Sequence, residues 1–329
     1  MKKLLYSVST IGIGNEIKKK IEEELFSNFF CIEIKNELNG YNKSFNYKLI
    51  AGFFKRLKLN EKLEDYHKKI ILKEIEKIKN VDYFLSIGNM RFSKVFFQQL
   101  KSNNSQIKTV LFLWDKVEYL PNDAVENIEN FDFVFTYDKD DSERYGYIFR
   151  PTFYIEEDDT DWNDKKYDIY YIGALREKKR YEYLCKIKNY LEKNNLKYYM
   201  KVFVDKELRE CLPKDYDKNI IIKKRITYKE NLNFLKESRV VLDIGYKNQK
   251  GLSLRPYEAL GMNIKLITDN EKVKDYEFYN KDNIKIIKNI KEIESLEKSF
   301  FKNPYSKIDE ELRNRYTIKI FLEEIFDII

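Results

Sequence analysis

The chain is poor in the residues that build small, cross-linked or fibrous folds. Among 329 residues there are one histidine, three cysteines, five prolines and ten glycines. So little glycine and proline, beside 43% hydrophobic and 16% aromatic residues, excludes a collagen-like or disordered chain. Cys31, Cys185 and Cys211 are far apart and show no C-x-x-C spacing, so we expect neither a disulfide framework nor a zinc site. A reducing compartment fits this cysteine usage.

Long hydrophobic runs are also missing. No stretch approaches the run of about 18 apolar residues that crosses a bilayer, so we expect no membrane span. The start, Met1–Tyr6, imitates a signal peptide for a few positions, but Ser7, Ser9 and Thr10 dilute it and no A-x-A cleavage site follows. We therefore expect a first buried strand and a cytoplasmic protein.

The chain has only a small excess of positive charge, and this excess is divided almost evenly between its two halves. Residues 1–150 hold 25 basic and 22 acidic side chains, and the remainder hold 37 and 33, which gives the formal charge of +7. Neither half is predicted to bind nucleic acid. The surplus would still favour peripheral contact with the anionic lipids of an inner membrane.

Short apolar runs rich in β-branched and aromatic residues alternate with charged stretches of helical period. This rhythm is typical of βαβ units and parallel sheets. Expected strands are Lys3–Ser9, Phe29–Ile34, Tyr83–Ile87, Thr109–Leu113, Phe133–Thr136, Ile169–Ile172, Met200–Phe203, Ile220–Ile222, Val240–Ile244, Lys265–Thr268 and Ile284–Ile287. At roughly 100–200 residues per domain, two domains are expected.

The best candidate linker is Pro151–Lys166, which has six acidic side chains and no apolar period. We interpret it as a solvated spacer. Residues 48–79 form the longest helical pattern, and its many charges indicate a solvated face. The expected domains are 1–155 on the acceptor side, 156–305 for a nucleotide-sugar donor, and 306–329 as C-terminal helices packing back on the first domain. The fold class is α/β, with two doubly wound domains and a ligand cleft between them.

The most informative stretch runs from Val240 to Met262. A buried strand enters a polar loop containing Gly251, and a helix begins near Arg255 with Pro256 in its first turn. The free amides and the helix dipole suit a pyrophosphate, and Glu258, one turn later, suits a ribose diol. An ordinary strand-loop-helix joint explains the same pattern.

These residues resemble the donor site of a known family. The segment from Gly251 to Gly261, GLSLRPYEALG, is similar to that of GT-B glycosyltransferases of bacterial capsule and lipopolysaccharide assembly. The similarity extends to 167–173 with Arg176, and to Leu113-Trp114-Asp115 and 131–138, so it covers about residues 80 to 270. Residues 1–79 match only in rhythm.

The resemblance implies two Rossmann-like domains facing across a cleft and a nucleotide-sugar donor. It assigns Arg176 to the diphosphate, Glu258 to the ribose and the turn at Ile226 to the nucleobase. The full set of donor-binding residues it implies is Gly173, Arg176, Ile226, Thr227, Gly251, Leu252, Ser253, Arg255 and Glu258. Many retaining members carry an acidic residue eight positions before the ribose glutamate, where this chain has Lys250. The anomeric outcome is therefore left open.

The acceptor side needs a group that takes the hydroxyl proton. Asp115 follows an expected strand and is preferred to His67, which we interpret as a surface residue of the charged 48–79 run; a capping role for Asp115 is an equal alternative. Gly12 and Gly14, just after the first strand, allow close approach of backbone to a ligand. The dinucleotide fingerprint fails because Ile17 stands where its third glycine belongs.

No cofactor or metal is expected. Asp138-Lys139-Asp140 imitates a D-x-D metal motif, but acidic pairs at this spacing are common in so charged a chain. A nucleotide-sugar epimerase uses the same fold, and the single His67 argues against it. A protein that binds nucleotide or glycan without catalysis is the third hypothesis, favoured only by Lys250.

Overall fold

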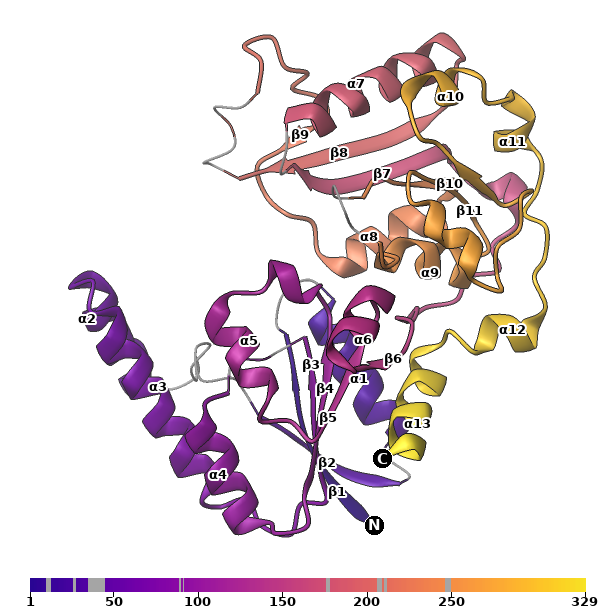
Figure 1. The fold of residues 1–329 in the computed structure, drawn as a ribbon. Coiled ribbons are helices and arrows are strands. Elements are labelled where there is room, and N and C mark those ends of the chain that lie inside the picture. The colour runs from indigo at the N-terminus through magenta and orange to yellow at the C-terminus, as the bar shows by residue number, and fades with distance from the viewer. Residues whose placement is uncertain are drawn as a thin grey trace. The chain divides into compact units, whose positions relative to one another are not determined.

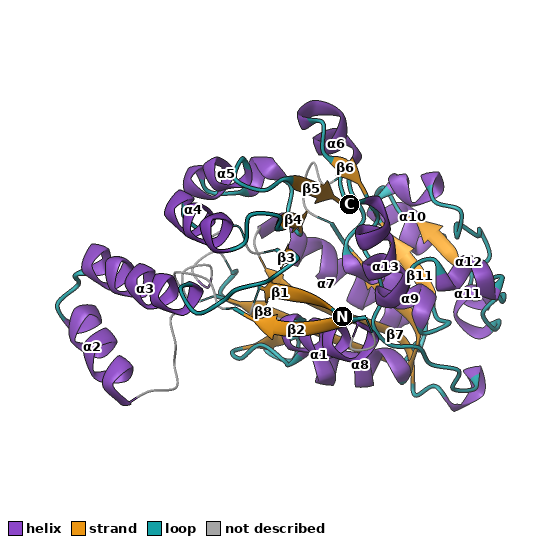
Figure 2. Ribbon diagram, turned by 90° about the horizontal axis from the view of Figure 1, so that it is seen from below, coloured by secondary structure: helices purple, strands orange, loops and turns teal. Residues whose placement is uncertain are grey.

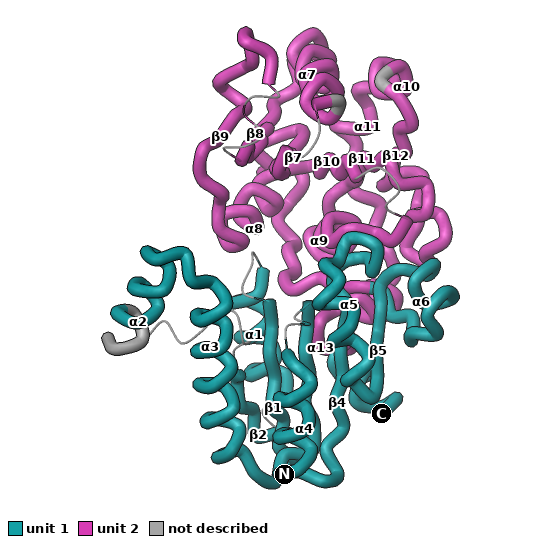
Figure 3. Tube along the Cα trace, turned by 60° about the vertical axis from the view of Figure 1, so that its left-hand side comes forward, with its two compact units in different colours: residues 1–151, 322–329 teal, residues 152–321 magenta. Residues whose placement is uncertain are grey.

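The chain folds into two compact units in a computed structural model. The structure describes residues 1–9, 13–25, 28–34, 45–88, 90, 92–175, 178–205, 209, 212–245 and 250–329. Unit 1 consists of residues 1–151 and 322–329, and unit 2 of residues 152–321 (Figure 3). The last helix is therefore divided between the units at residue 321.

Unit 1 is a parallel six-stranded sheet in the order β2-β1-β3-β4-β5-β6 (Figure 1). Its strands are β1 (Lys2–Val8), β2 (Phe29–Glu33), β3 (Tyr83–Ile87), β4 (Lys108–Leu113), β5 (Phe133–Thr136) and β6 (Ile148–Phe149). Its helices are α1 (Gly14–Leu25), α2 (Phe45–Arg56), α3 (Asn60–Ile75), α4 (Lys94–Asn103), α5 (Asn122–Ile128) and α6 (Lys139–Tyr145), with a 3-10 turn at Val117–Tyr119.

The sheet of unit 1 is buried on both faces, which explains its continuous apolar strands. Leu5, Phe84 and Leu111 pack against α3, α4 and α5 on one face. Leu4 and Tyr6 are equally buried and point to the other face, where Figure 1 shows α1. The chain adds β2 on one side of β1 and then adds β3 and the later strands on the other side, so the strand order reverses between β1 and β3.

Unit 2 is a second parallel six-stranded sheet, in the order β12-β11-β10-β7-β8-β9. Its strands are β7 (Tyr167–Leu175), β8 (Tyr198–Val204), β9 (Ile221–Ile222), β10 (Ser238–Asp243), β11 (Lys265–Thr268) and β12 (Ile284–Ile286). Its helices are α7 (Lys178–Lys193), α8 (Tyr228–Lys236), α9 (Leu254–Gly261), α10 (Ile290–Glu294), α11 (Lys298–Lys302) and α12 (Glu310–Asn314), with 3-10 turns at Trp162–Asp164 and Glu271–Asp275. The divided last helix is α13 (Ile318–Ile328), which begins in unit 2 and ends in unit 1.

Helices cover both faces of this sheet as well. Tyr171 and Val202 pack with α7, α10 and α11 on one face. Tyr170 and Val241 pack with α8 and α9 on the other face. Figure 1 shows these two helices on the side of the sheet opposite α7. The strand order reverses between β7 and β10, and ligands of open α/β sheets bind at the carboxyl ends of the strands at such a reversal.

Each of the eleven expected strands is confirmed, with ends shifted by a few residues. The two-residue edge strand β6 was not predicted. The helical pattern over 48–79 is two helices, α2 and α3. The chain breaks between them where Lys58 adopts a positive φ of 54°. Among the described residues, no helix is long and apolar enough to cross a membrane.

The prediction of a surface histidine is wrong. His67 is buried on α3, on the same face as Leu63, Ile71 and Ile75. The four residues recur every fourth position, which is the period of a helix face turned to a core. The other positions of α3 carry exposed charges. These charges dominate the composition of the segment, so composition did not reveal the buried face.

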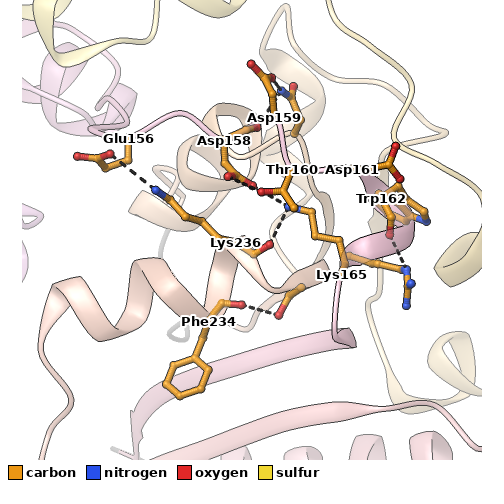
Figure 4. A network of polar contacts seen from close by, with 12 residues as sticks. Glu156, Asp158, Asp159, Thr160, Asp161, Trp162, Lys165, Phe234 and Lys236 are labelled. Carbon is orange, nitrogen blue, oxygen red and sulfur yellow. Dashed lines mark hydrogen bonds and ion pairs between the residues drawn. The ribbon is translucent and has the colours of Figure 1, made fainter.

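The acidic segment is a solvated spacer only in part: Glu157, Asp159, Asp161 and Asp164 are exposed, whereas other residues of the segment are buried. Residues 152–155 are buried, and Lys165 forms a buried ion pair with Asp158 at 2.8 Å. The Lys165 ammonium also donates to the backbone oxygen of Lys236 at 2.8 Å, so α8 holds the segment in place (Figure 4). Some of the cations that pair with these carboxylates lie outside the segment. The composition of the segment therefore shows mainly acidic charge, which favoured the prediction of a solvated spacer.

The end of α9 rests on the same segment. A Cβ atom at Gly261 would lie 2.6 Å from Cδ2 of Tyr154 and 2.7 Å from the backbone oxygen of Glu156. No side chain fits there, because the closest atoms belong to backbone and to a buried ring. The glycine therefore sets how closely α9 approaches the segment that begins unit 2.

Candidate functional site

The candidate site lies in unit 2, where β7 and β10 end and α9 begins. Asp243 is the last residue of β10, and its buried carboxylate joins three elements. Ser253 donates from Oγ to Oδ1 of Asp243 at 3.1 Å, and Thr268 at the end of β11 donates to Oδ2 at 3.4 Å. The side chain thus fixes the start of α9 to the ends of two strands.

The loop before α9 is held by further polar contacts. Ser253 is the N-cap of α9, and its Oγ accepts from the backbone N–H of Arg255 at 3.3 Å. Asn270 donates from Nδ2 to the backbone oxygens of Lys250 and Gly251 at 3.3 and 3.2 Å. With Gly251 and Leu252 buried, the helix start is fixed before any ligand arrives.

Arg255 places a guanidinium at this point. Its Nη2 donates to the backbone oxygen of Ile172 on β7, and the guanidinium carbon lies 5.9 and 5.8 Å from the ring centres of Tyr170 and Tyr171. Among the described residues, no group accepts a hydrogen bond from its buried Nη1. A buried donor without an acceptor costs about 1–3 kcal/mol, so this N–H favours an incoming anionic oxygen.

Glu258 is buried one turn further along α9. Asn231 of α8 donates from Nδ2 to Glu258 Oε1 at 3.3 Å, and the Asn231 Oδ1 accepts from the Tyr170 hydroxyl at 2.7 Å. Burial raises the pKa of Glu258, while the charge of Arg255 and hydrogen bonds from Tyr228 and Asn231 act in the opposite direction. The carboxylate is an acceptor in a low-dielectric setting, where hydrogen bonds to a charged group are strong.

The buried Asp243 carboxylate has a half-buried neighbour in the site, Asp269. Burial raises the pKa of Asp243 and of Asp269, and Asp269 accepts from the backbone N–H of Gly245 at 2.8 Å. Arg180 of α7 donates from Nη2 to the backbone oxygen of Ile244. Asp243, Asp269 and Asn231 were not among the expected site residues. The one signal in the sequence is that Asp243 and Asp269 end or follow a buried strand.

The turn expected to border the nucleobase precedes α8, and a side chain of α8 connects this region to Glu258. Thr227 is the N-cap of α8, with its Oγ1 and backbone N–H bonded to the Glu230 carboxylate at 2.8 and 2.7 Å. Ile226 packs into the core that also contains Tyr170. Because α8 supplies Asn231 to Glu258, the turn and the expected ribose carboxylate are brought together.

The remaining expected donor residues are placed less fully. Gly173 is half-buried near the end of β7, and a Cβ there would lie 2.6 Å from the Tyr171 hydroxyl oxygen. Arg176 lies outside the described residues, and so does Gly12. Arg255, Ser253, Gly251, Leu252 and Glu258 share the start of α9, as their spacing requires.

Asp115 is in unit 1, just after β4, and its side chain is exposed. Its charge helps to raise the pKa of the neighbouring Tyr137, after the larger effect of burial. Trp114 packs on Gly88, which has a φ of +62°, and a Cβ added to Gly88 would lie 2.9 Å from the Trp114 Cβ, so only glycine suits this position. Asp115 follows β4, which is the next strand after β3 in the sheet. It is therefore one strand away from the point between β1 and β3 where the strand order reverses.

Gly14 and the D-x-D sequence have structural roles in unit 1. A Cβ at Gly14 would lie 1.8 Å from the backbone oxygen of Ser9, so close packing of α1 on β1 accounts for this glycine. Asp138 is the buried N-cap of α6 and accepts from the Asp141 N–H at 3.1 Å. Asp140 pairs with Lys116 at 3.7 Å.

No protein-family model and no curated protein matches the sequence. Solved structures do match over the whole chain. A UDP-GlcNAc 2-epimerase from Methanocaldococcus jannaschii is 14% identical, with a TM-score of 0.53 and coverage of 100% of this chain and 99% of that one. An alpha-glucosyltransferase in complex with UDP-glucose and DNA is 13% identical, with a TM-score of 0.53 and the same coverage.

A UDP-GlcNAc 2-epimerase from Neisseria meningitidis bound to UDP-GlcNAc gives a similar result. It is 12% identical, with a TM-score of 0.52 and coverage of 99% of this chain and 100% of that one. At these identities the comparisons establish the fold alone. The protein is an α/β protein with two Rossmann-like units of the GT-B type, as the sequence predicts.

Proposed function

We propose that the protein is a glycosyltransferase that moves a sugar from a nucleotide-sugar donor to a growing bacterial surface glycan. One observation carries the proposal: Arg255 Nη1 and the buried Glu258 carboxylate lie on the first turns of one helix at the β7–β10 reversal. A cation at a helix start and a carboxylate one turn later match the diphosphate and ribose of a nucleotide.

Each part of the donor has a proposed partner. The start of α9, Arg255 and Arg176 bind the diphosphate, with Gly173, Gly251, Leu252 and Ser253 lining that position. Glu258 accepts from the ribose hydroxyls, and the turn at Ile226 and Thr227 borders the base. As the nucleotide leaves, charge builds on its terminal phosphate. The α9 dipole and the guanidinium stabilise that charge.

The acceptor chemistry is assigned to unit 1. Asp115 takes the proton from the attacking hydroxyl, which is the role of a general base. The step is proposed to run without a metal or another cofactor. The glycan or glycolipid acceptor belongs to capsule, lipopolysaccharide or a related polymer, and the enzyme acts in the cytoplasm at the inner membrane.

Thermal shift with UDP, GDP, CMP and dTDP tests the donor site. One of these nucleotides should raise the melting temperature of the wild type, and Glu258→Gln, Arg255→Met and Arg176→Ala should lose that increase. Glu237→Gln, an exposed glutamate at the end of α8, is the matched control and should keep it. Equal increases in all five proteins would show that the donor site is elsewhere.

An epimerase is the second candidate, because two of the similar structures are UDP-GlcNAc 2-epimerases. The donor contacts would be the same, so binding does not separate the two functions. Product analysis with a nucleotide sugar alone does. A changed sugar without any acceptor favours epimerisation, transfer to a cell-surface glycan extract favours the transferase, and binding with neither product favours a non-catalytic protein.

A further inference from the structure

Helix α2 carries an apolar face that is open to solvent. Leu49, Ile50, Phe53 and Leu57 are 58%, 37%, 58% and 51% exposed. Their spacing of one, four and eight residues from Leu49 places all four on one side of a helix. Leu57 is one residue past the end of α2, and its N–H continues the helical pattern by bonding to the backbone oxygen of Phe53 at 3.1 Å. They are four of the ten large hydrophobic side chains that are exposed in the described part of the chain, and they fall within nine residues.

The other side of α2 is held by a small separate core. Ala51 and Phe54 pack with Leu63, Tyr66 and Ile70 of α3, apart from the main cores. Figures 1 and 2 both show α2 beyond α3, away from the sheet of unit 1. Other exposed apolar residues of this unit, such as Phe30 and Val95, are scattered singly. Single residues need no explanation, whereas a contiguous patch indicates a binding surface.

The same segment holds the positive charge of its half of the sequence. Between Glu37 and Glu61 there are five basic residues and no acidic one. Residues 1–150 carry a net charge of +3, so the rest of that stretch sums to −2. The net positive charge is divided evenly between the two halves of the sequence, but within the first half it is concentrated in this segment. Lys55, Arg56 and Lys58 are exposed in the same segment as the apolar face.

We propose that α2 docks on an anionic lipid bilayer. The helix lies in the interface plane, with Leu49, Ile50, Phe53 and Leu57 at the acyl boundary and Lys55, Arg56 and Lys58 among the headgroups. A second copy of the chain fits the face less well, because two such basic segments repel each other. The proposal names a surface for membrane contact and does not depend on sugar transfer.

Vesicle flotation of the full chain tests this surface. The wild type should bind phosphatidylcholine vesicles that contain phosphatidylglycerol, bind less as salt rises, and not bind pure phosphatidylcholine. Phe53→Ser/Leu57→Ser should weaken binding about tenfold or more, because two apolar side chains leave the interface. Lys55→Gln/Arg56→Gln should weaken it by roughly fivefold for each lost cation.

Matched controls come from the same unit. Val95→Ser removes an exposed apolar side chain from α4, and Lys68→Gln/Lys69→Gln removes two exposed cations from α3. The Val95 control should bind as the wild type, and the α3 control should lose much less than the α2 variants. The substituted side chains are exposed, so circular dichroism and melting temperature should be unchanged.

Two results would overturn the proposal. One is vesicle binding that is absent in the wild type or equal in the α2 variants and their controls. The other is a dimer in light scattering that Phe53→Ser/Leu57→Ser dissociates, without vesicle binding, which assigns the face to a second copy. Neither measurement involves a nucleotide, so failure here is distinct from failure of the donor site.

Discussion

Asn231 donates a hydrogen bond to Glu258 over 3.3 Å, and so connects the second turn of α8 to the second turn of α9. The same amide accepts from Tyr170 on β7. One side chain therefore orients the carboxylate proposed for the ribose and links it to the central strand. The proposed donor site therefore depends on Asn231, a residue that is not itself expected to contact the nucleotide.

Asn231→Ala should lower both stability and nucleotide affinity. It leaves the Tyr170 hydroxyl and the Glu258 carboxylate without this partner, and an unsatisfied buried group costs about 1–3 kcal/mol. Urea denaturation measures the free energy of unfolding. Asn233→Ala, at an exposed position of the same helix, should change it by less than about 0.5 kcal/mol. Similar losses in both would mean that α8 is weakened in general.

Lys165→Met should destabilise unit 2 far more than Lys166→Met. The Lys165 side chain is 1% exposed and pairs with Asp158, whereas the Lys166 side chain is 62% exposed and pairs with Glu237 at 3.5 Å. Breaking a buried pair costs about 3–5 kcal/mol, and an exposed pair contributes about 0–1 kcal/mol. Chemical denaturation of the two variants side by side gives the difference. Equal costs would indicate that the acidic segment is solvated after all.

Glycine-to-alanine changes should have opposite signs at two helix positions. Gly261→Ala places a Cβ against Tyr154 and the backbone of Glu156, and overpacking of this kind costs about 1–3 kcal/mol. Gly52→Ala on α2 meets open space, and in a helix interior alanine is more stable than glycine by about 0.5–1 kcal/mol. Melting temperatures should therefore fall for the first variant and rise for the second.

The buried carboxylates predict a direction of pH dependence. Burial raises the pKa of Asp243 and Asp269, so the folded state binds their protons more tightly than the unfolded state does. Above the unfolded pKa of about 4, stability falls as pH rises toward the raised pKa values. Asp243→Asn/Asp269→Asn removes this loss, so its stability relative to wild type should increase with pH. A constant difference from acid to neutral pH would contradict the assignment.

Asp115→Asn should separate binding from catalysis. Because Asp115 belongs to unit 1 and Glu258 to unit 2, the variant should keep the melting-temperature increase caused by the nucleotide. Its transfer to acceptor should fall by about 100-fold or more, as expected when a general base is removed. Asp132→Asn, just before the start of the neighbouring strand β5, should have little effect on transfer. Full transfer by Asp115→Asn would reassign the base.

The fold was predictable because its strands are buried on both faces. Runs such as Thr109–Leu113 and Lys265–Thr268 are short, apolar and bounded by polar residues, and nothing competes with that signal. The start of α9 was predictable for a similar reason, since Pro256 and Gly251 each have a strong local preference. These features depend on neighbours in the sequence.

The polar part of the site was only partly predictable. Asn231 reaches Glu258 across 27 positions, and Asp243 meets Thr268 across 25, so no local pattern reports either contact. Lys165 and His67 were misinterpreted because their surroundings are charged in sequence and buried in space. Burial of a polar side chain depends on distant partners, which composition does not contain.

The two sheets also differ in the connection that follows the second strand of each unit. Between β8 and β10, unit 2 has the edge strand β9 and then α8. Between β2 and β3, the described residues of unit 1 contain α2 and α3 in place of such a strand. The two sheets therefore cease to correspond at this segment. Helix α2, with its exposed apolar face, thus occupies the place in the chain of unit 1 that the edge strand β9 has in unit 2.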